Sequence, residues 1–119
     1  MATKRRIMKR RKPSKPPFVG HWDIIDSEDI DDLALVAGPA EISFEAKDYG
    51  GRFSLCAMEA EIDWRQSDER TVEFTFEGHD EEEEVFGRGR GWLDDGGHML
   101  VTLWFHKGDT LSLIAERNG

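Results

Sequence analysis

The sequence has a single cysteine, Cys56, so no disulfide can form within the chain. It also lacks any apolar run near the roughly 18 residues that a membrane-spanning helix needs. The basic N-terminus is not followed by the apolar stretch of roughly 7–15 residues that marks a secretory signal. These absences predict a cytoplasmic location without membrane insertion. The 119 residues suffice for one domain but are too few for two ordinary ones.

Motifs of catalysis and of cofactor binding are missing as well. No serine or cysteine stands in the context of a nucleophile elbow, and no metal-binding Cys/His or EF-hand spacing occurs. The glycine-rich run 87–91 lacks the Lys-Ser/Thr pair of a phosphate-binding loop. We therefore expect a protein that is not an enzyme and needs no cofactor. We assign no catalytic, cofactor-binding or metal-binding residue.

Charge is divided unevenly along the chain, whose formal net charge is −9. Residues 1–17 hold none of the 25 acids and eight of the 16 bases, which leaves a balance of −17 for the remainder; the eight are Lys4, Arg5, Arg6, Lys9, Arg10, Arg11, Lys12 and Lys15. Before Phe18 only Ile7 and Met8 are large and apolar, too few to offset the entropy of ordering. We predict a basic, disordered arm over residues 1–17 and a single acidic domain over 18–119.

Apolar and polar residues alternate along most of the domain, which predicts half-buried β-strands. The alternation is clearest where Val72, Phe74 and Phe76 share one face. Similar runs cover residues 20–25, 42–46, 53–64, 85–93, 99–106 and 111–115. Within 53–64 the parity slips near Ala57, which suggests a β-bulge or a bend, and Cys56 is expected to be a small buried residue in this strand.

Helix and turn signals complete the predicted fold. Ser27 can cap a short helix over residues 28–37, and Gly38-Pro39 ends it. Tight turns are predicted at Asp94–Gly97 and Lys107–Asp109. The order predicts a mainly β domain, an antiparallel meander of about seven strands that forms a closed or partly open barrel with one short helix near its N-terminus.

The second half of the domain carries a recognisable pattern in three segments, 72–81, 89–92 and 105–109. These segments are similar to the pattern VEFxxEGxDE…GRGW…FHxGD of a group of small bacterial β-rich proteins of uncharacterised function, within a resemblance that covers roughly residues 40–117. Phe76, the doubled Gly-Arg of 87–91 and Thr110-Leu111 depart from the pattern. The resemblance implies a bacterial β-rich domain and no particular activity.

The start of the domain carries a second, shorter resemblance. Gly20-His21-Trp22 is similar to the Gly-X-Trp near the first strand of lipocalin-like (calycin) barrels. This similarity implies that the barrel closes, and it does not establish a ligand cavity.

Four residues of the second half are candidate contacts for a ligand or partner. Trp92 and Trp104 would mark an interface if they lie on an exposed face. The run 99–105 looks apolar on both faces, so its outer side is covered either by the short helix or by a second subunit. For Arg88 and Arg90 we favour cross-strand ion pairs with Glu73, Glu77 or Glu45; alternatively, they hold an anion at the mouth of a pocket.

The histidines suggest two further candidate sites. His106 and Asp109 flank a tight turn, where Asp109 could accept backbone N–H groups and His106 could pair with it. The alternative is a general acid/base site that includes His98. His79 and the acids 80–84 could bind a divalent cation, but consecutive glutamates cannot converge on one ion, so a solvated acidic loop is favoured.

These features leave three classes of function. The favoured class is a non-enzymatic binding or protein-interaction module, whose partner is another protein, a second copy of the chain or a small ligand in the barrel. The second is a nucleic-acid-associated protein that contacts polyanions through Lys4, Arg5, Arg6, Lys9, Arg10, Arg11 and Lys12. The acidic domain would repel nucleic acid, and the arm could instead fold onto that domain. The third is a small hydrolase, for which no motif is present.

Overall fold

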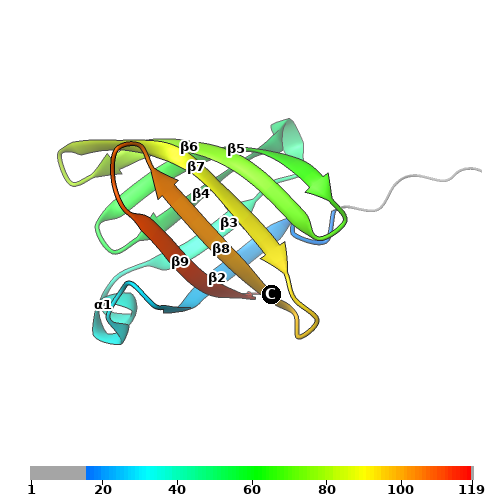
Figure 1. Cartoon of the computed structure of the whole chain (residues 1–119), viewed down its shortest axis with the longest axis horizontal. Helices are drawn as coiled ribbons and strands as arrows, with labels where there is room; N and C mark the ends of the chain where they lie inside the picture. Colours follow the sequence, from blue (N-terminus) through cyan, green and yellow to red (C-terminus); the bar gives the residue numbers. More distant parts are fainter. Residues whose placement is uncertain (1–15, 119) are drawn as a thin grey trace, which may run out of the picture.

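The computed structural model describes residues 16–118, and these form a closed barrel of eight antiparallel strands (Figure 1). Each strand pairs with the next one in the sequence, and β9 pairs with β2 to close the barrel. The strands are β2 (Gly20–Ser27), β3 (Ala40–Phe44), β4 (Gly50–Leu55), β5 (Met58–Asp68), β6 (Thr71–Asp80), β7 (Glu83–Leu93), β8 (His98–Phe105) and β9 (Thr110–Arg117). The predicted fold class is therefore confirmed, with eight strands in place of about seven and with full closure.

The additional strand results from a turn between β4 and β5 that no typical turn residue marks in the sequence. The run 53–64 is divided by a tight turn at Cys56 and Ala57 into β4 and β5, and Leu55 pairs directly with Met58. Cys56 adopts a left-handed backbone conformation with φ of 58°, and its side chain is exposed. Of the bulge or bend predicted near Ala57, the chain makes a complete reversal at this position and no bulge. The predicted burial of Cys56 within a strand was wrong, because no Gly, Asn or Asp marks this turn.

Aromatic rings occupy the barrel interior from end to end. Phe18 lies edge-on to Trp64 and Phe44, with ring centroids 5.0 and 5.9 Å away, and Phe53 lies 5.1 Å from Phe76. The buried hydrophobic strand residues are Trp22, Ile24, Ile42, Phe44, Phe53, Leu55, Ala60, Ile62, Trp64, Val72, Phe74, Phe76, Met99, Val101, Leu103, Leu113 and Ala115. Alternation along each strand sends these side chains inward and leaves the outer wall to their neighbours.

Glycines on β7 make room for this crowded interior. Gly89 pairs with Phe74 and Gly91 with Val72, so both glycines face the lumen. A Cβ on Gly89 would lie 2.2 Å from Cζ of Phe74, well inside van der Waals contact. The glycine-interrupted strand predicted over 85–93 thus has a specific cause, because the Phe74 ring fills the space that a side chain on Gly89 would need.

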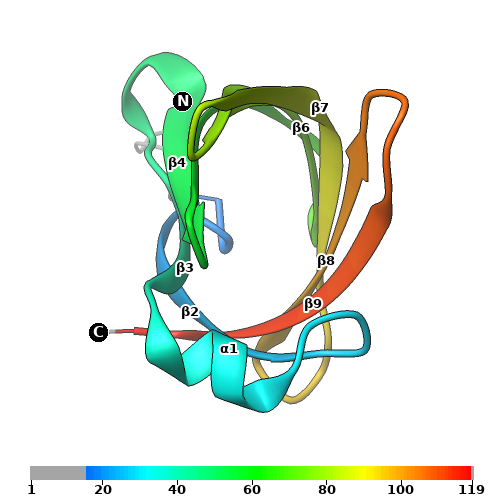
Figure 2. The ribbon, with the colours of Figure 1, turned by 90° about the vertical axis from the view of Figure 1, so that its left-hand side faces the viewer.

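The two ends of the barrel differ. At one end the turn 16–19 places Phe18, which is fully buried, against the core, and the Val19 N–H donates to the Pro16 carbonyl over 3.1 Å. Figure 2 views the barrel from the other end, where helix α1 (Asp32–Ala37) lies along the rim. We call this second end the open end.

Helix α1 is shorter than predicted. It begins after Asp31, whose carboxylate accepts a hydrogen bond from the Leu33 N–H, and it ends at Gly38 as expected. Ser27 is the last residue of β2 and not the cap; its hydroxyl donates to the Ser112 carbonyl over 2.8 Å. Leu35 is the buried residue of α1, and the helix lies against β2 and the turn at Cys56, so α1 does not cover the outer side of β8.

Candidate functional site

The outer wall of β7 and β8 carries most of the predicted contact residues. Outward side chains alternate along β7 as Phe86, Arg88, Arg90 and Trp92, because the odd-numbered positions of this strand face the lumen. Register places Trp104 of β8 beside Arg88. The guanidinium of Arg88 lies 5.0 Å from the centroid of the Trp104 ring, a cation–π contact. The structure therefore brings four of the six candidate contacts onto one wall of the barrel.

The cross-strand ion pairs predicted for Arg88 and Arg90 are not formed among residues 16–118. Glu73 does stand opposite Arg90 in the ladder, as the hypothesis requires. Its carboxylate, however, pairs with Arg65 on the other side, over 3.3 Å. Arg88 rests on Trp104 instead of on a carboxylate. Both arginines are exposed and keep their charge available to solvent.

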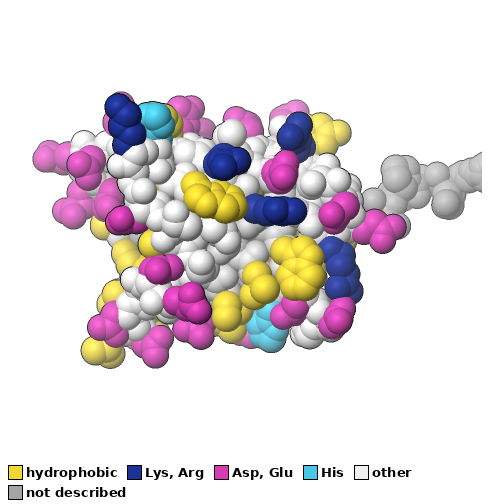
Figure 3. All heavy atoms as spheres, viewed as in Figure 1, with side chains coloured by type: hydrophobic (Ala, Val, Ile, Leu, Met, Phe, Trp, Pro, Cys, Tyr) yellow, Lys and Arg dark blue, Asp and Glu magenta, His cyan; other side chains and the backbone are white. Residues whose placement is uncertain are grey.

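An apolar row crosses this wall, as Figure 3 shows from the viewpoint of Figure 1. Trp92 pairs with Leu100, and Leu100 pairs with Ile114 on β9. Trp92 is 43% exposed and Leu100 is 39% exposed. The outer side of β8, predicted to be covered by the helix or by a second subunit, is therefore not covered by α1. We call Trp92, Leu100 and Ile114 the apolar row.

His106 and Asp109 lie at the predicted turn without pairing. The His106 ring stacks on Phe86 with centroids 4.6 Å apart and an interplanar angle of 21°. The backbone carbonyl of Asp109 accepts a hydrogen bond from the Phe105 N–H over 3.1 Å. Among the described residues neither a His106–Asp109 hydrogen bond nor an ion pair is formed. The two residues line a rim depression of about 350 Å³ at the open end, together with Phe105 and Leu111.

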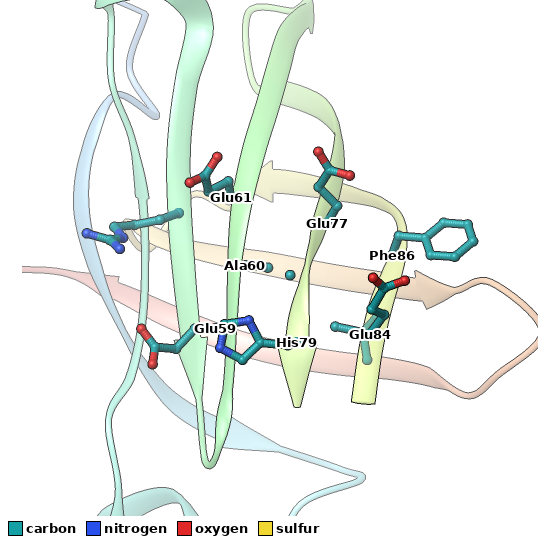
Figure 4. A pocket seen from close by; sticks show the side chains of 10 residues that line it. Glu59, Ala60, Glu61, Glu77, His79, Glu84 and Phe86 are labelled. Atoms are coloured by element: carbon teal, nitrogen blue, oxygen red, sulfur yellow. The ribbon is translucent and has the colours of Figure 1, made fainter. Parts of the chain in front are cut away.

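A second depression lies next to it on the outer wall of β4 to β7, and it is strongly acidic (Figure 4). Its volume is about 410 Å³. We call it the acidic cleft, and the side chains that define it are Arg52, Glu59, Glu61, Glu77, His79, Glu84 and Phe86. The carboxylates project from the same side of three neighbouring strands in Figure 4, because each occupies an outward position. The cleft is a surface on which negative charge is concentrated.

Two glutamates of the acidic cleft face each other directly. Glu61 on β5 pairs in register with Glu77 on β6. On the far side of Glu61 stands Arg52, and among residues 16–118 it is the only Lys or Arg that lines the cleft. Phe86 pairs with Glu77 from β7 and is 49% exposed. Like charges directly opposite each other destabilise a sheet, so this arrangement carries a free-energy cost in the isolated protein.

The loops of the open end extend the same charge. Acidic residues on these loops and the adjoining strand ends are Glu28, Asp29, Asp31, Asp32, Asp80, Glu81, Glu82, Glu83, Glu84 and Asp109, against a single Lys107. No group of three or more His, Cys, Asp or Glu side chains in residues 16–118 converges on a metal position. The predicted acidic loop is only a two-residue turn at Glu81 and Glu82, because His79 and Asp80 end β6 and Glu83 and Glu84 begin β7. His98 lies near Asp94, away from both depressions.

The sequence indicated some of these surfaces and missed others. Arg52, Glu59 and Glu61 were not recognised as site residues, because a polar residue on an outward strand position is unremarkable until its neighbours are known. Strand register could have revealed the Glu61–Glu77 opposition. The arm residues proposed to contact polyanions, Lys4 through Lys12, lie outside the described part of the chain.

Comparison with known proteins adds no assignment. No protein-family model matches the sequence, and no curated protein matches it. The resemblance of residues 40–117 to small bacterial β-rich proteins and the Gly-X-Trp similarity of Gly20–Trp22 therefore stay predictions. Between residues 16 and 118 there is no helix with the length and apolar character needed to cross a membrane.

Proposed function

We propose that this chain is a non-enzymatic binding module that holds a basic segment of a partner protein in the acidic cleft. The observation that carries the proposal is the direct opposition of Glu61 and Glu77 in a cleft with one arginine. Opposed like charges cost a sheet a few tenths to about 1 kcal/mol. A bound Lys or Arg side chain would lie between the two carboxylates and recover that cost.

The neighbouring aromatic pair supports a peptide as the occupant in preference to a bare cation. Phe86 is half-exposed at the edge of the acidic cleft and is backed by the His106 ring. Arginine stacks on aromatic faces, and lysine lays its methylene stem along apolar surface while its ammonium group stays in water. A basic segment would therefore gain contact with Phe86 as well as with the carboxylates.

The other functional classes have less physical support. Aromatic side chains fill the barrel interior, which argues against a bulky ligand inside the lumen. The acids of the open end would repel a phosphate backbone, which argues against nucleic acid at this surface. His98 lies beside Asp94 and does not line the depression that His106 and Asp109 share, so the acid/base hypothesis lacks a common pocket.

Substituting one glutamate of the opposed pair tests the proposal. The probe is a fluorescein-labelled peptide of alternating Arg and Ser residues, titrated with the full-length chain at near-physiological salt and read by fluorescence anisotropy. We expect Glu77→Gln to weaken peptide binding about 3-fold and, at the same time, to raise the free energy of unfolding by up to about 1 kcal/mol. Weaker peptide binding together with higher stability would show that the Glu77 charge serves binding and does not stabilise the fold.

Glu69→Gln is the matched control. Glu69 lies at the exposed turn between β5 and β6, at the other end of the barrel, and its substitution changes the net charge equally. Equal weakening by both variants would mean that the peptide senses only the net charge of the domain, and the proposal would be rejected. Unchanged binding by Glu77→Gln would reject it too.

A further inference from the structure

The apolar row stands out on the outer wall because its residues are contiguous. Trp92, Leu100 and Ile114 occupy one register line across β7, β8 and β9. Adjacent strands are about 4.8 Å apart, so the three side chains are immediate neighbours across the wall. Single exposed apolar residues are ordinary, whereas a contiguous row of large ones is typical of an interface.

Opposite charges flank the apolar row at diagonal positions. Arg90 is the next outward residue from Trp92 on β7, and it faces Thr102 of β8. Glu116 is the next outward residue from Ile114 on β9, and it faces His98 of β8. Leu100 lies between Thr102 and His98 on β8, so it is the midpoint between Arg90 and Glu116. Both charged residues are exposed, and neither forms an ion pair within 4.0 Å among residues 16–118.

We propose that this wall is a self-complementary interface through which two copies of the chain form a symmetric dimer. The two-fold axis lies in the contact plane and passes over Leu100. It runs perpendicular to the line from Arg90 to Glu116, so it exchanges these two positions. Each Arg90 then faces Glu116 of the other copy, and Leu100 meets Leu100 of the other copy. A two-fold interface needs this pairing of unlike positions on one patch.

Charge complementarity selects a second copy as the occupant. A partner with an unrelated surface would need a carboxylate and a base placed in the same diagonal arrangement around an apolar centre, and the chain itself already provides both. Asp23 of β2, which pairs with Glu116 in the ladder, extends the acidic flank, and Arg88 extends the basic one. Figure 3 shows Lys and Arg side chains gathered on the β7 side of the row.

The interface is independent of the proposed function, because it uses the opposite half of β7 from Phe86 and leaves the acidic cleft free. The area covered by three side chains and their charged flanks is smaller than the area of about 800 Å² that each partner buries in a standard interface. The dimer is therefore weak, with a dissociation constant in the range of about 10–100 µM. Its ion pairs are exposed at the rim, so added salt weakens it further.

Sedimentation equilibrium of the full-length chain provides the test, over roughly 5 to 300 µM to bracket the expected affinity. We expect a reversible rise from the mass of one chain to twice that mass. The variants Arg90→Glu and Glu116→Arg each place like charges opposite each other in both contacts of the dimer, so each remains a monomer. Mixed in equal amounts, the two variants form a heterodimer, because each of its two contacts then joins a carboxylate to a guanidinium.

Matched controls separate this interface from a general effect of charge. Lys47→Glu and Glu69→Arg make the same charge changes at exposed turns outside the patch, and both should dimerise as the wild type does. Far-ultraviolet circular dichroism verifies that each variant is folded. A monomeric wild type throughout the concentration range overturns the proposal. A dimer that persists in Arg90→Glu, or a mixture that stays monomeric, overturns it as well.

Discussion

The guanidinium of Arg117, in β9, lies 4.4 Å from the centroid of the Trp22 ring in β2. The same guanidinium donates to the Val19 carbonyl over 2.8 Å and to the carbonyl of Pro17. The Trp22 indole N–H donates to the Phe18 carbonyl over 2.9 Å. One residue pair thus connects the seam between β2 and β9 to the turn that closes one end of the barrel.

Replacing Arg117 should loosen that seam. Arg117→Met keeps an unbranched side chain over Trp22 but removes the charge and the two donors. We expect the free energy of unfolding to fall by about 1–3 kcal/mol, the sum of a cation–π contact and two modest hydrogen bonds. Urea denaturation followed by tryptophan fluorescence measures the change. Arg65→Met, which removes an exposed ion pair, is the control and should cost less than about 1 kcal/mol.

A side chain at Gly89 should collide with the core. Gly89→Val places its Cβ against the Phe74 ring, and we expect a loss of about 1–3 kcal/mol or more through overpacking. The second substitution Phe74→Leu should restore part of the loss, since the two positions share one space. Gly50→Ala is the control, because the nearest atom to its Cβ is 3.9 Å away. Thermal unfolding is measured for Gly89→Val, Phe74→Leu, the double variant and Gly50→Ala. Purely additive effects at positions 74 and 89 would contradict the shared space.

Asp68 should give the protein a specific sensitivity to acid. Hydrogen bonds from the Arg70 backbone N–H, over 2.9 Å, and from Thr71 hold the pKa of the Asp68 carboxyl below its ordinary value of 3.8. A pKa that is lower in the folded than in the unfolded protein adds stability above pH 3.8, and that stability is lost as the pH falls through the folded-state pKa. Asp68→Asn should flatten this part of the stability curve. Urea denaturation between pH 2 and pH 6 tests it, and an unchanged slope would show that other carboxyls are responsible.

A glycine at position 56 should make the β4–β5 turn more stable. A non-glycine residue in the left-handed region costs about 1 kcal/mol, and Cys56 has φ of 58°. Cys56→Gly should therefore raise the free energy of unfolding by up to about 1 kcal/mol. Ala57→Gly, at a position without positive φ, should lower the free energy of unfolding.

The exposed thiol of Cys56 should be reactive in the folded wild type. We expect it to react with an aromatic disulfide reagent at a rate close to that of a small thiol, and slow reaction would contradict its exposure.

Much of the fold followed from local pattern. The alternation of Val72, Phe74 and Phe76 predicted inward and outward faces correctly, and the turns at Asp94–Gly97 and Lys107–Asp109 lie where glycine and aspartate placed them. The β4–β5 turn was missed because Cys56 enters the left-handed region without any of the residues that usually mark it. Helix α1 was predicted too long, because several acids in succession offered more than one plausible cap.

The candidate sites depended on register much more than on residue type. The sequence named Arg88, Arg90, Trp92 and Trp104, and these do share one wall. It could not show that Arg88 rests on Trp104, since that contact joins two strands through a pairing fixed by the β7–β8 turn. The expected His106–Asp109 pair is replaced by the stacking of His106 on Phe86, which lies 20 positions earlier in the chain.

The sequence by itself determined that this chain makes a meander of amphipathic strands, because apolar and polar residues alternate with a period of two along the chain. It also determined the unequal division of charge between residues 1–17 and the domain. Only the tertiary structure decided that the barrel closes, through the pairing of β9 with β2, and that Glu61 stands opposite Glu77. Both outcomes depend on how strands from distant parts of the chain pair with each other. A one-residue shift in that pairing would move side chains to the opposite face of the sheet, and local residue preferences do not specify the register.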